Sequence, residues 1–204
     1  MLVQFASCDK PKDQDKKLNM RLAKLPSDDT VYLQDQKLTD CDIPIVVQEA
    51  VINIKCSRLV LDWNKITDKG AEHFGRVLQS NTSLSVLFMN NNQISNRGTN
   101  YITQALYTNR TLTELHIRGN QITDEGALFI AQVLYINSTL EELYLADNTI
   151  GDRGAQYLAL ALTQNTTLKV LDLRMEQVNI ANNIKICWLR SFSYLKHRVK
   201  VIRK

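Results

Sequence analysis

The fold of this 204-residue chain is decided by the segment Leu143-Tyr144-Leu145-Ala146-Asp147-Asn148-Thr149-Ile150. Leucines alternate with other residues at its start, which indicates a short β-strand with the leucines on its buried side. The asparagine that follows lies where the strand bends away, and its side-chain amide can satisfy backbone groups that no longer pair. The segment therefore predicts a buried strand followed by an asparagine-stabilised turn.

The same pattern recurs at a spacing of 28 residues. Three copies precede it and start at Leu59, Leu87 and Leu115, and fainter copies run over residues 31–38 and 171–178. A fixed period of this length is typical of a solenoid, whose terminal repeats are expected to be atypical. The asparagines that we expect to form a stacked structural ladder are Asn64, Asn92, Asn120 and Asn148.

A helix is expected after the turn in each repeat, because apolar residues recur there at i, i+3, i+6 and i+7 and form one buried face. The four sets are Ala71/Phe74/Val77/Leu78, Thr99/Ile102/Ala105/Leu106, Ala127/Ile130/Val133/Leu134 and Ala155/Leu158/Ala161/Leu162. The residues predicted to cap the helix N-termini are Asp68, Asn96, Asp124 and Asp152. The sequence thus predicts an α/β fold, a right-handed solenoid in a horseshoe arc with about five to six repeats. Its parallel strands would line the concave face and its helices the convex face.

The 28-residue unit, best seen from Leu143 to Leu171, resembles the ribonuclease-inhibitor-like class of leucine-rich repeats. That class includes ribonuclease inhibitor, the repeat domains of NOD-like receptors and the Ran GTPase-activating protein. The resemblance covers roughly residues 28–179 and implies an architecture rather than an activity, because the class shares a fold and not a function. The stand-alone format is also similar to effector proteins that intracellular bacteria inject into host cells.

Three parts of the chain are expected. Residues 1–27 would form an N-terminal cap or mobile segment, in which Leu18, Leu22 and Leu25 keep helical spacing and could cover the core. Residues 28–179 form the solenoid. Residues 180–204 contain seven Lys or Arg and no acidic residue, and they predict a basic amphipathic helix. Capping of the last repeat is its leading interpretation. Contact with an anionic membrane surface, or with nucleic acid or an import receptor, remains an alternative.

Strand alternation identifies the side chains of the concave face. Its centre is a stripe of Tyr32, Phe88, His116 and Tyr144, with Trp63 beside it. Exposed aromatic residues flanked by charges match the composition of protein-binding hot spots, although such rings can also simply stack and stabilise the sheet. The candidate partner-binding residues are Tyr32, Arg58, Val60, Asp62, Trp63, Phe88, Asn90, His116, Arg118, Glu142, Tyr144, Asp172 and Arg174.

Cysteines and sequons carry weaker signals. The four cysteines form no Cys-x-x-Cys pair, which argues against a zinc site or disulfide framework and favours free thiols in a cytoplasmic setting. Cys56 takes a leucine position and is interpreted as a core residue. Four Asn-x-Ser/Thr sequons recur just after the helices, and we interpret them as left-handed helix ends rather than glycosylation sites. These asparagines are Asn81, Asn109, Asn137 and Asn165.

The sequence predicts a non-enzymatic module that binds a partner protein on its concave face. No cofactor, metal, small-molecule substrate or nucleic-acid partner is expected, and the chain shows neither a signal peptide nor an apolar run long enough for a membrane span. An effector would enter the host cytoplasm without a cleaved signal. The alternative function is regulation of a small GTPase, by resemblance to the Ran GTPase-activating protein, although no catalytic positions match.

Overall fold

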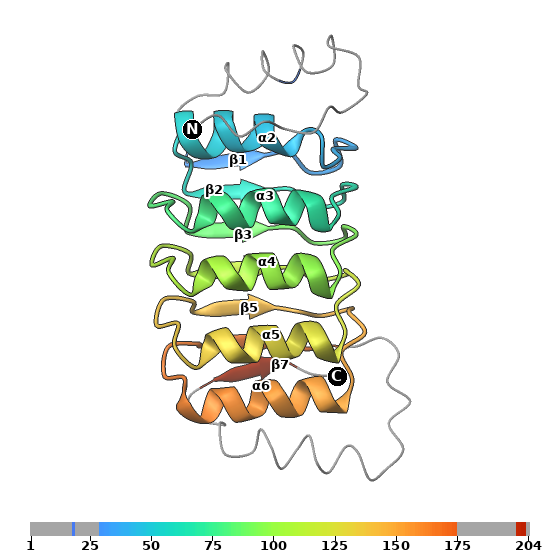
Figure 1. Ribbon diagram of the computed structural model, residues 1–204, viewed down its shortest axis with the longest axis vertical. Coiled ribbons are helices and arrows are strands. Elements are labelled where there is room, and N and C mark those ends of the chain that lie inside the picture. Colours follow the sequence, from blue (N-terminus) through green and yellow to red (C-terminus); the bar gives the residue numbers. More distant parts are fainter. Residues whose placement is uncertain (1–17, 19–28, 175–198, 203–204) are drawn as a thin grey trace.

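The computed structural model describes residue 18 and residues 29–174 and 199–202. Strands and helices alternate along the chain and stack along its long axis (Figure 1). Within the described residues the elements are β1 (Thr30–Tyr32), α2 (Ile43–Val46), η1 (Val47–Asn53), β2 (Arg58–Val60), α3 (Asp68–Leu78), β3 (Val86–Phe88), α4 (Asn96–Leu106), β4 (Glu114–His116), α5 (Asp124–Leu134), β5 (Glu142–Tyr144), α6 (Asp152–Gln164), β6 (Val170–Asp172) and β7 (Lys200–Ile202).

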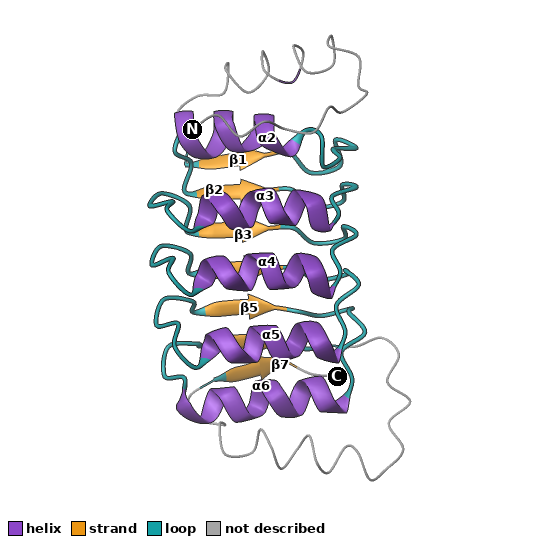
Figure 2. Cartoon of the chain, viewed as in Figure 1, coloured by secondary structure: helices purple, strands orange, loops and turns teal. Residues whose placement is uncertain are grey.

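The strands form one parallel sheet in sequential order from β1 to β7. Leu59 pairs with Leu87, and the same step of 28 residues continues through Leu115 and Leu143 to Leu171. The helices form a second layer in front of the strands in the view of Figure 2. The predicted solenoid of parallel strands and helices is therefore confirmed, and its register is set by the leucines.

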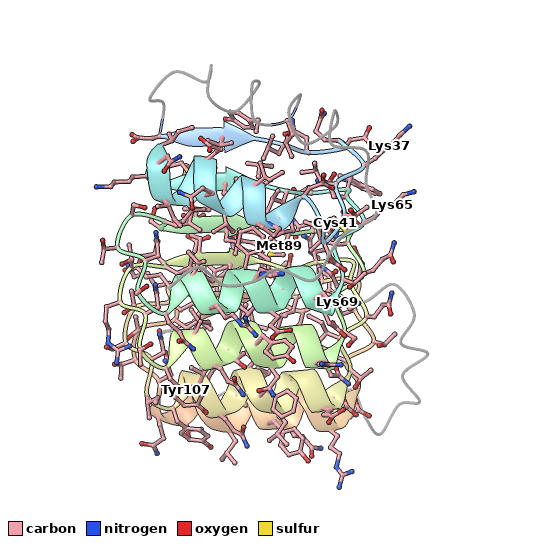
Figure 3. All side chains as sticks on the ribbon, turned by 45° about the horizontal axis from the view of Figure 1, so that its top comes forward. Lys37, Cys41, Lys65, Lys69, Met89 and Tyr107 are labelled. Atoms are coloured by element: carbon pink, nitrogen blue, oxygen red, sulfur yellow. The ribbon has the colours of Figure 1, made fainter. Side chains whose placement is uncertain are left out.

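The core lies between these two layers. The inward leucines of the strands are buried together with the predicted apolar faces of the helices, of which Val77 alone is only partly buried. Met89 takes an inward position of β3's repeat and lies inside the molecule, whereas Lys37 and Lys65 project from one edge (Figure 3). One repeat exposes too much apolar surface to be stable alone, so each repeat depends on its neighbours for burial.

The predicted ladder asparagines are buried and link adjacent repeats. The Nδ2 group of Asn64 donates to the carbonyl oxygens of Leu33 and Leu61, each at 2.9 Å, and its Oδ1 accepts from Leu38 N at 2.9 Å. Asn92, Asn120 and Asn148 make corresponding contacts. Each amide therefore satisfies backbone groups of its own repeat and of the repeat before it.

The predicted N-caps are wrong by one residue. The caps are Thr67, Ser95 and Thr123, whose hydroxyl oxygens accept from the backbone N–H two residues later, and Gly151, which makes no side-chain cap bond. Asp68 points instead to the next repeat. Its carboxylate accepts from Ser95 N at 2.8 Å and Gly98 N at 2.9 Å. Sequence inspection missed this because the acceptors and donors lie 27 to 30 residues apart.

This second ladder repeats along the helix starts. The same contacts to the next helix are made by Asp40, Asp68, Asn96 and Asp124. It also explains the glycine at the third position of helices α3 to α6. A Cβ on Gly98 would lie 2.5 Å from Asp68 Oδ1 and 2.7 Å from Ile94 Cγ2, so only glycine admits the carboxylate.

The sequon asparagines are structural, but not as left-handed helix ends. Asn165 has φ −67° and ψ 125°, and no sequon asparagine belongs to the described residues with positive φ. Asn109 is buried, donates from Nδ2 to Leu78 O at 2.7 Å, and accepts from Leu112 N at 2.8 Å. Asn137 and Asn165 do the same one and two repeats later. They form a third ladder that closes the loop between helix and strand.

The cysteines differ from expectation. Cys56 is buried, and desolvation raises the pKa of its thiol to about 11, as suits a core residue. Cys41, however, is disulfide-bonded. Cys56 is a free thiol and is not its partner. The expectation that all thiols are free is therefore wrong.

The C-terminal end departs from the predicted helix. Lys200–Ile202 form β7, which pairs in parallel with β6 and places Val201 opposite Leu171. The spacing of 30 residues, two more than the repeat, hid this strand from a search at the 28-residue period. Val199 is buried against the core. Residues 180–198 of the predicted helix lie outside the described residues.

At the N-terminal end Leu18 is buried in the same core cluster. The other two leucines of the predicted cap, Leu22 and Leu25, lie outside the described residues. In the part of the chain that the structure describes, no helix is long and apolar enough to cross a membrane.

Candidate functional site

The strands present one surface opposite the helices, which we call the sheet face. The predicted central column lies there in register, because Tyr32 pairs with Val60, Val60 with Phe88, Phe88 with His116, and His116 with Tyr144. Tyr32 is 65% exposed, while the next four side chains are partly buried. The structure therefore brings the aromatic residues of four repeats together on one surface.

Three of these rings form what we call the aromatic stack: Phe88, His116 and Tyr144. The centroids of Phe88 and His116 are 4.0 Å apart, and those of His116 and Tyr144 are 4.1 Å apart with an interplanar angle of 8°. The guanidinium of Arg58 lies 5.6 Å from the centroid of Phe88 and extends the stack by a cation–π contact. This arrangement is compatible with both interpretations of the rings, which are stabilisation of the sheet and binding of a partner. The rings stabilise one another by stacking, and they still form part of the surface.

His116 is the polar member of the stack. Its Nε2 is buried and has no hydrogen-bond partner within the described part of the chain; the nearest carboxylate oxygen, on Glu114, is 3.6 Å away. Desolvation lowers the pKa of His116 to about 4, outweighing the opposite effect of Asp62 and Glu142. The imidazole is therefore neutral at pH 7 and behaves as an aromatic ring.

Because His116 is neutral in the folded protein, we expect the free energy of unfolding to fall in acid. Its pKa of about 4 in the folded protein lies below the ordinary histidine pKa of 6.5, so only the unfolded chain takes up this proton between those pH values. Stability from this group is complete above pH 6.5 and falls by on the order of 3 kcal/mol as the pH drops to about 4. His116→Phe keeps the stack and removes the titration.

Urea unfolding at a series of pH values, compared for the two proteins, measures this contribution. The difference in free energy of unfolding between His116→Phe and the unmodified protein should grow steadily from pH 6.5 down to pH 4. Parallel profiles over that range would show that the imidazole does not titrate as the geometry implies.

Tyr144 is oriented by a carboxylate on its own strand. Its hydroxyl donates to Glu142 Oε2 at 2.6 Å, and this hydrogen bond is the main reason that the pKa of Tyr144 is raised to about 12. Glu142 pairs in the sheet with Glu114, so two carboxylates lie along one side of the aromatic stack. The stack is thus bordered by Arg58 at one end and acidic groups along its flank.

A row of polar residues runs along the other side. Asp62 Oδ1 accepts from Asn90 N at 2.8 Å, and Asn90 Oδ1 accepts in turn from Arg118 N at 2.8 Å. The guanidinium of Arg118 forms an ion pair with Asp147. Arg118 and Asp147 lie 29 positions apart in the sequence, so no local pattern could have paired them.

Trp63 lies beside this row and is 64% exposed. Its backbone has φ +59°, a left-handed conformation that costs a non-glycine residue on the order of 1 kcal/mol. The same repeat position holds Asp35, Asn91, Gly119 and Asp147, all with positive φ and all more tolerant of it. Trp63 is therefore the exception at a strained position, which the sequence pattern did not reveal.

Two candidate residues at the end of the sheet face behave differently from expectation. Asp172 is only 1% exposed, because Arg174 covers it with hydrogen bonds from Nε at 3.0 Å and Nη2 at 2.7 Å. Its carboxylate is thus not free to meet a partner, whereas part of the Arg174 side chain remains exposed.

The described residues contain no cluster of three or more His, Cys, Asp or Glu that could hold a metal ion.

Comparison with known proteins identifies the repeat. A family described as leucine-rich repeat matches residues 57–75, 108–131 and 137–159. Among solved structures, actin-binding site 2 of leiomodin-1 is similar with a TM-score of 0.56 and 24% identity, over 76% of this chain and 91% of that one. The C-terminal domain of tropomodulin from Caenorhabditis elegans is similar with a TM-score of 0.51 and 12% identity, over 90% and 93%.

These similarities show the fold alone, because identities are low. No curated protein sequence matches the chain. The effector role expected from the format of the array finds no support among these matches.

Proposed function

Since this chain carries leucine-rich repeats of the ribonuclease-inhibitor-like type, we propose that it is a non-enzymatic module that binds a protein partner on its sheet face. The observation that carries this proposal is the aromatic stack of Phe88, His116 and Tyr144, and the first two repeats add the exposed rings of Tyr32 and Trp63. Aromatic residues arranged on a rigid sheet lose little conformational entropy on binding and are enriched at binding hot spots.

The double variant Phe88→Ala and Tyr144→Ala is expected to abolish capture of the partner, by more than about a hundredfold in affinity if both rings are hot spots. The fold should persist, because the inward Leu87 and Leu143 of the same strands are buried and unchanged. Affinity capture from cell lysate followed by quantitative mass spectrometry, with circular dichroism of the purified variant, measures both effects.

The matched control is Tyr135→Ala, which removes an exposed ring from the end of the helix layer. It should leave capture unchanged. Recovery of the same partner by the double variant at the strength of the unmodified protein would show that the aromatic stack is a structural feature only.

Actin is the narrower candidate partner, because one of the similar structures is an actin-binding site. The unmodified protein, the double variant and the Tyr135→Ala control can each be tested by co-sedimentation with actin filaments and by gel filtration with monomeric actin. Binding that the double variant loses and the control keeps would identify actin as a partner. Absence of binding to both forms would remove actin and leave the general proposal to the capture experiment.

A further inference from the structure

Trp63 borders a hollow of about 480 Å³ on the sheet face. The lining residues are Asp62, Trp63, Asn90, Asn91, Arg118 and Asp147. They come from four consecutive repeats, just after the ends of strands β2, β3, β4 and β5. A hollow of this size falls within the range of small-ligand sites, about 300–1,000 Å³, and is large enough for one long side chain.

The charges of the hollow do not cancel. Arg118 and Asp147 form an ion pair with each other. Asp62 accepts from Asn90 N at 2.8 Å and from Asn90 Nδ2 at 3.2 Å, both neutral donors. Within the described residues, Asp62 has no ion pair. One uncompensated carboxylate therefore lies beside one exposed indole.

These two groups together favour a cation of a particular shape. An indole is the best aromatic partner for a cation, and a guanidinium can stack on its face as a flat group. The same guanidinium has further N–H donors that match a carboxylate. An ammonium is a compact and strongly hydrated charge that cannot stack in this way, and an anion would be repelled by Asp62.

We propose that this hollow receives an arginine side chain of the partner protein, with its guanidinium stacked on Trp63 and hydrogen-bonded to Asp62. This inference rests on the proposed function, because it names the chemistry that the partner presents to the sheet face. The contact that selects the partner therefore lies in this hollow, beside the aromatic stack.

The probe is the peptide acetyl-Gly-Arg-Gly-amide, titrated into the full chain labelled with ¹⁵N and followed by NMR. Trp63 is one of two tryptophans, so its indole N–H signal is assigned by its loss in Trp63→Phe. The indole and the amides of Asn90 and Asn91 should shift saturably at millimolar peptide, since a single contact of this kind is weak. High salt should weaken the shift, because Asp62 acts by charge.

Asp62→Asn should weaken this binding roughly three- to tenfold. The variant should fold, because an asparagine already takes the equivalent place one repeat later. There, Asn90 Oδ1 accepts a hydrogen bond from Arg118 N at 2.8 Å. The matched control is Glu72→Gln, which removes one negative charge from helix α3 and should leave peptide binding unchanged.

Two further peptides decide the chemistry. The citrulline peptide keeps the shape without the charge and should give no saturable shift, and the glutamate peptide should give none either. Equal shifts for the arginine and citrulline peptides, or no shift for arginine, would overturn the proposal. If the partner is still captured through the aromatic stack in that case, only this inference fails and the proposed function stands.

Discussion

Replacing Asn120 by alanine is expected to lower the free energy of unfolding by about 4 kcal/mol. The Nδ2 group of Asn120 donates to the carbonyl oxygens of Met89 at 3.0 Å and Ile117 at 3.1 Å, and its Oδ1 accepts from Ile94 N at 3.0 Å. Each buried group left without a partner costs about 1–3 kcal/mol, and the loss of the side chain leaves a void.

The large effect follows from the position of Asn120 between repeats. Its partners include backbone groups of the preceding repeat, Met89 and Ile94, so removing it weakens two repeats at once. Equilibrium unfolding in urea measures the change. Asn100→Ala, on the outer part of helix α4, is the control and should change stability by less than about 0.5 kcal/mol. A loss below about 1 kcal/mol for Asn120→Ala would mean that water replaces the ladder amide without cost.

Replacing Asp68 by alanine is expected to cost about 3 kcal/mol. Its carboxylate accepts from Ser95 N at 2.8 Å, Gly98 N at 2.9 Å and Ser95 Oγ at 2.6 Å. These donors lie at the N-terminus of helix α4, where backbone N–H groups have no partner within the helix. The variant loses both the bonds between repeats and the interaction of a negative charge with the helix dipole.

Asp68→Asn separates these two contributions. Asn96 takes the same place one repeat later, where its Oδ1 accepts from Thr123 N at 2.8 Å and its Nδ2 donates to Thr123 Oγ1 at 2.8 Å. An asparagine at position 68 should therefore keep most of the stability and lose about 1 kcal/mol or less. Thermal and urea unfolding of both variants tests this. If the asparagine variant is as unstable as the alanine variant, the charge matters more than the hydrogen-bond geometry.

The three ladders show where sequence inspection succeeded and where it stopped. Asn64, Asn92 and their counterparts were assigned correctly to a place at the end of each strand, because a polar residue at a fixed offset from buried leucines has few other functions. Asp68 was assigned to its own helix, since the common pattern of capping is local. Its donors belong to a helix that begins a full repeat later, and no local rule contains that distance.

The candidate binding surface divides in the same way. Alternation along the strands placed Phe88, His116 and Tyr144 on one surface, since successive side chains of a strand point to opposite sides. It did not predict that the rings would lie 4.0–4.1 Å apart or that His116 would lose its usual basicity. It also did not predict that Arg174 would cover Asp172. The ring contacts and the burial of His116 are outcomes of packing between neighbouring repeats, whereas Arg174 and Asp172 lie only two positions apart and their contact depends on the side-chain conformations.

The sequence by itself determined the repeat, its leucine register and the two layers, because burial of apolar residues is encoded by their local spacing. The tertiary structure alone decided which polar side chain meets which backbone group, the strand β7, the disulfide at Cys41 and the strained, exposed position of Trp63. The physical reason is distance along the chain. The ladder hydrogen bonds, the ring contacts and the pairing of β7 with β6 join residues about one repeat apart, and their partners are defined only once the repeats have stacked.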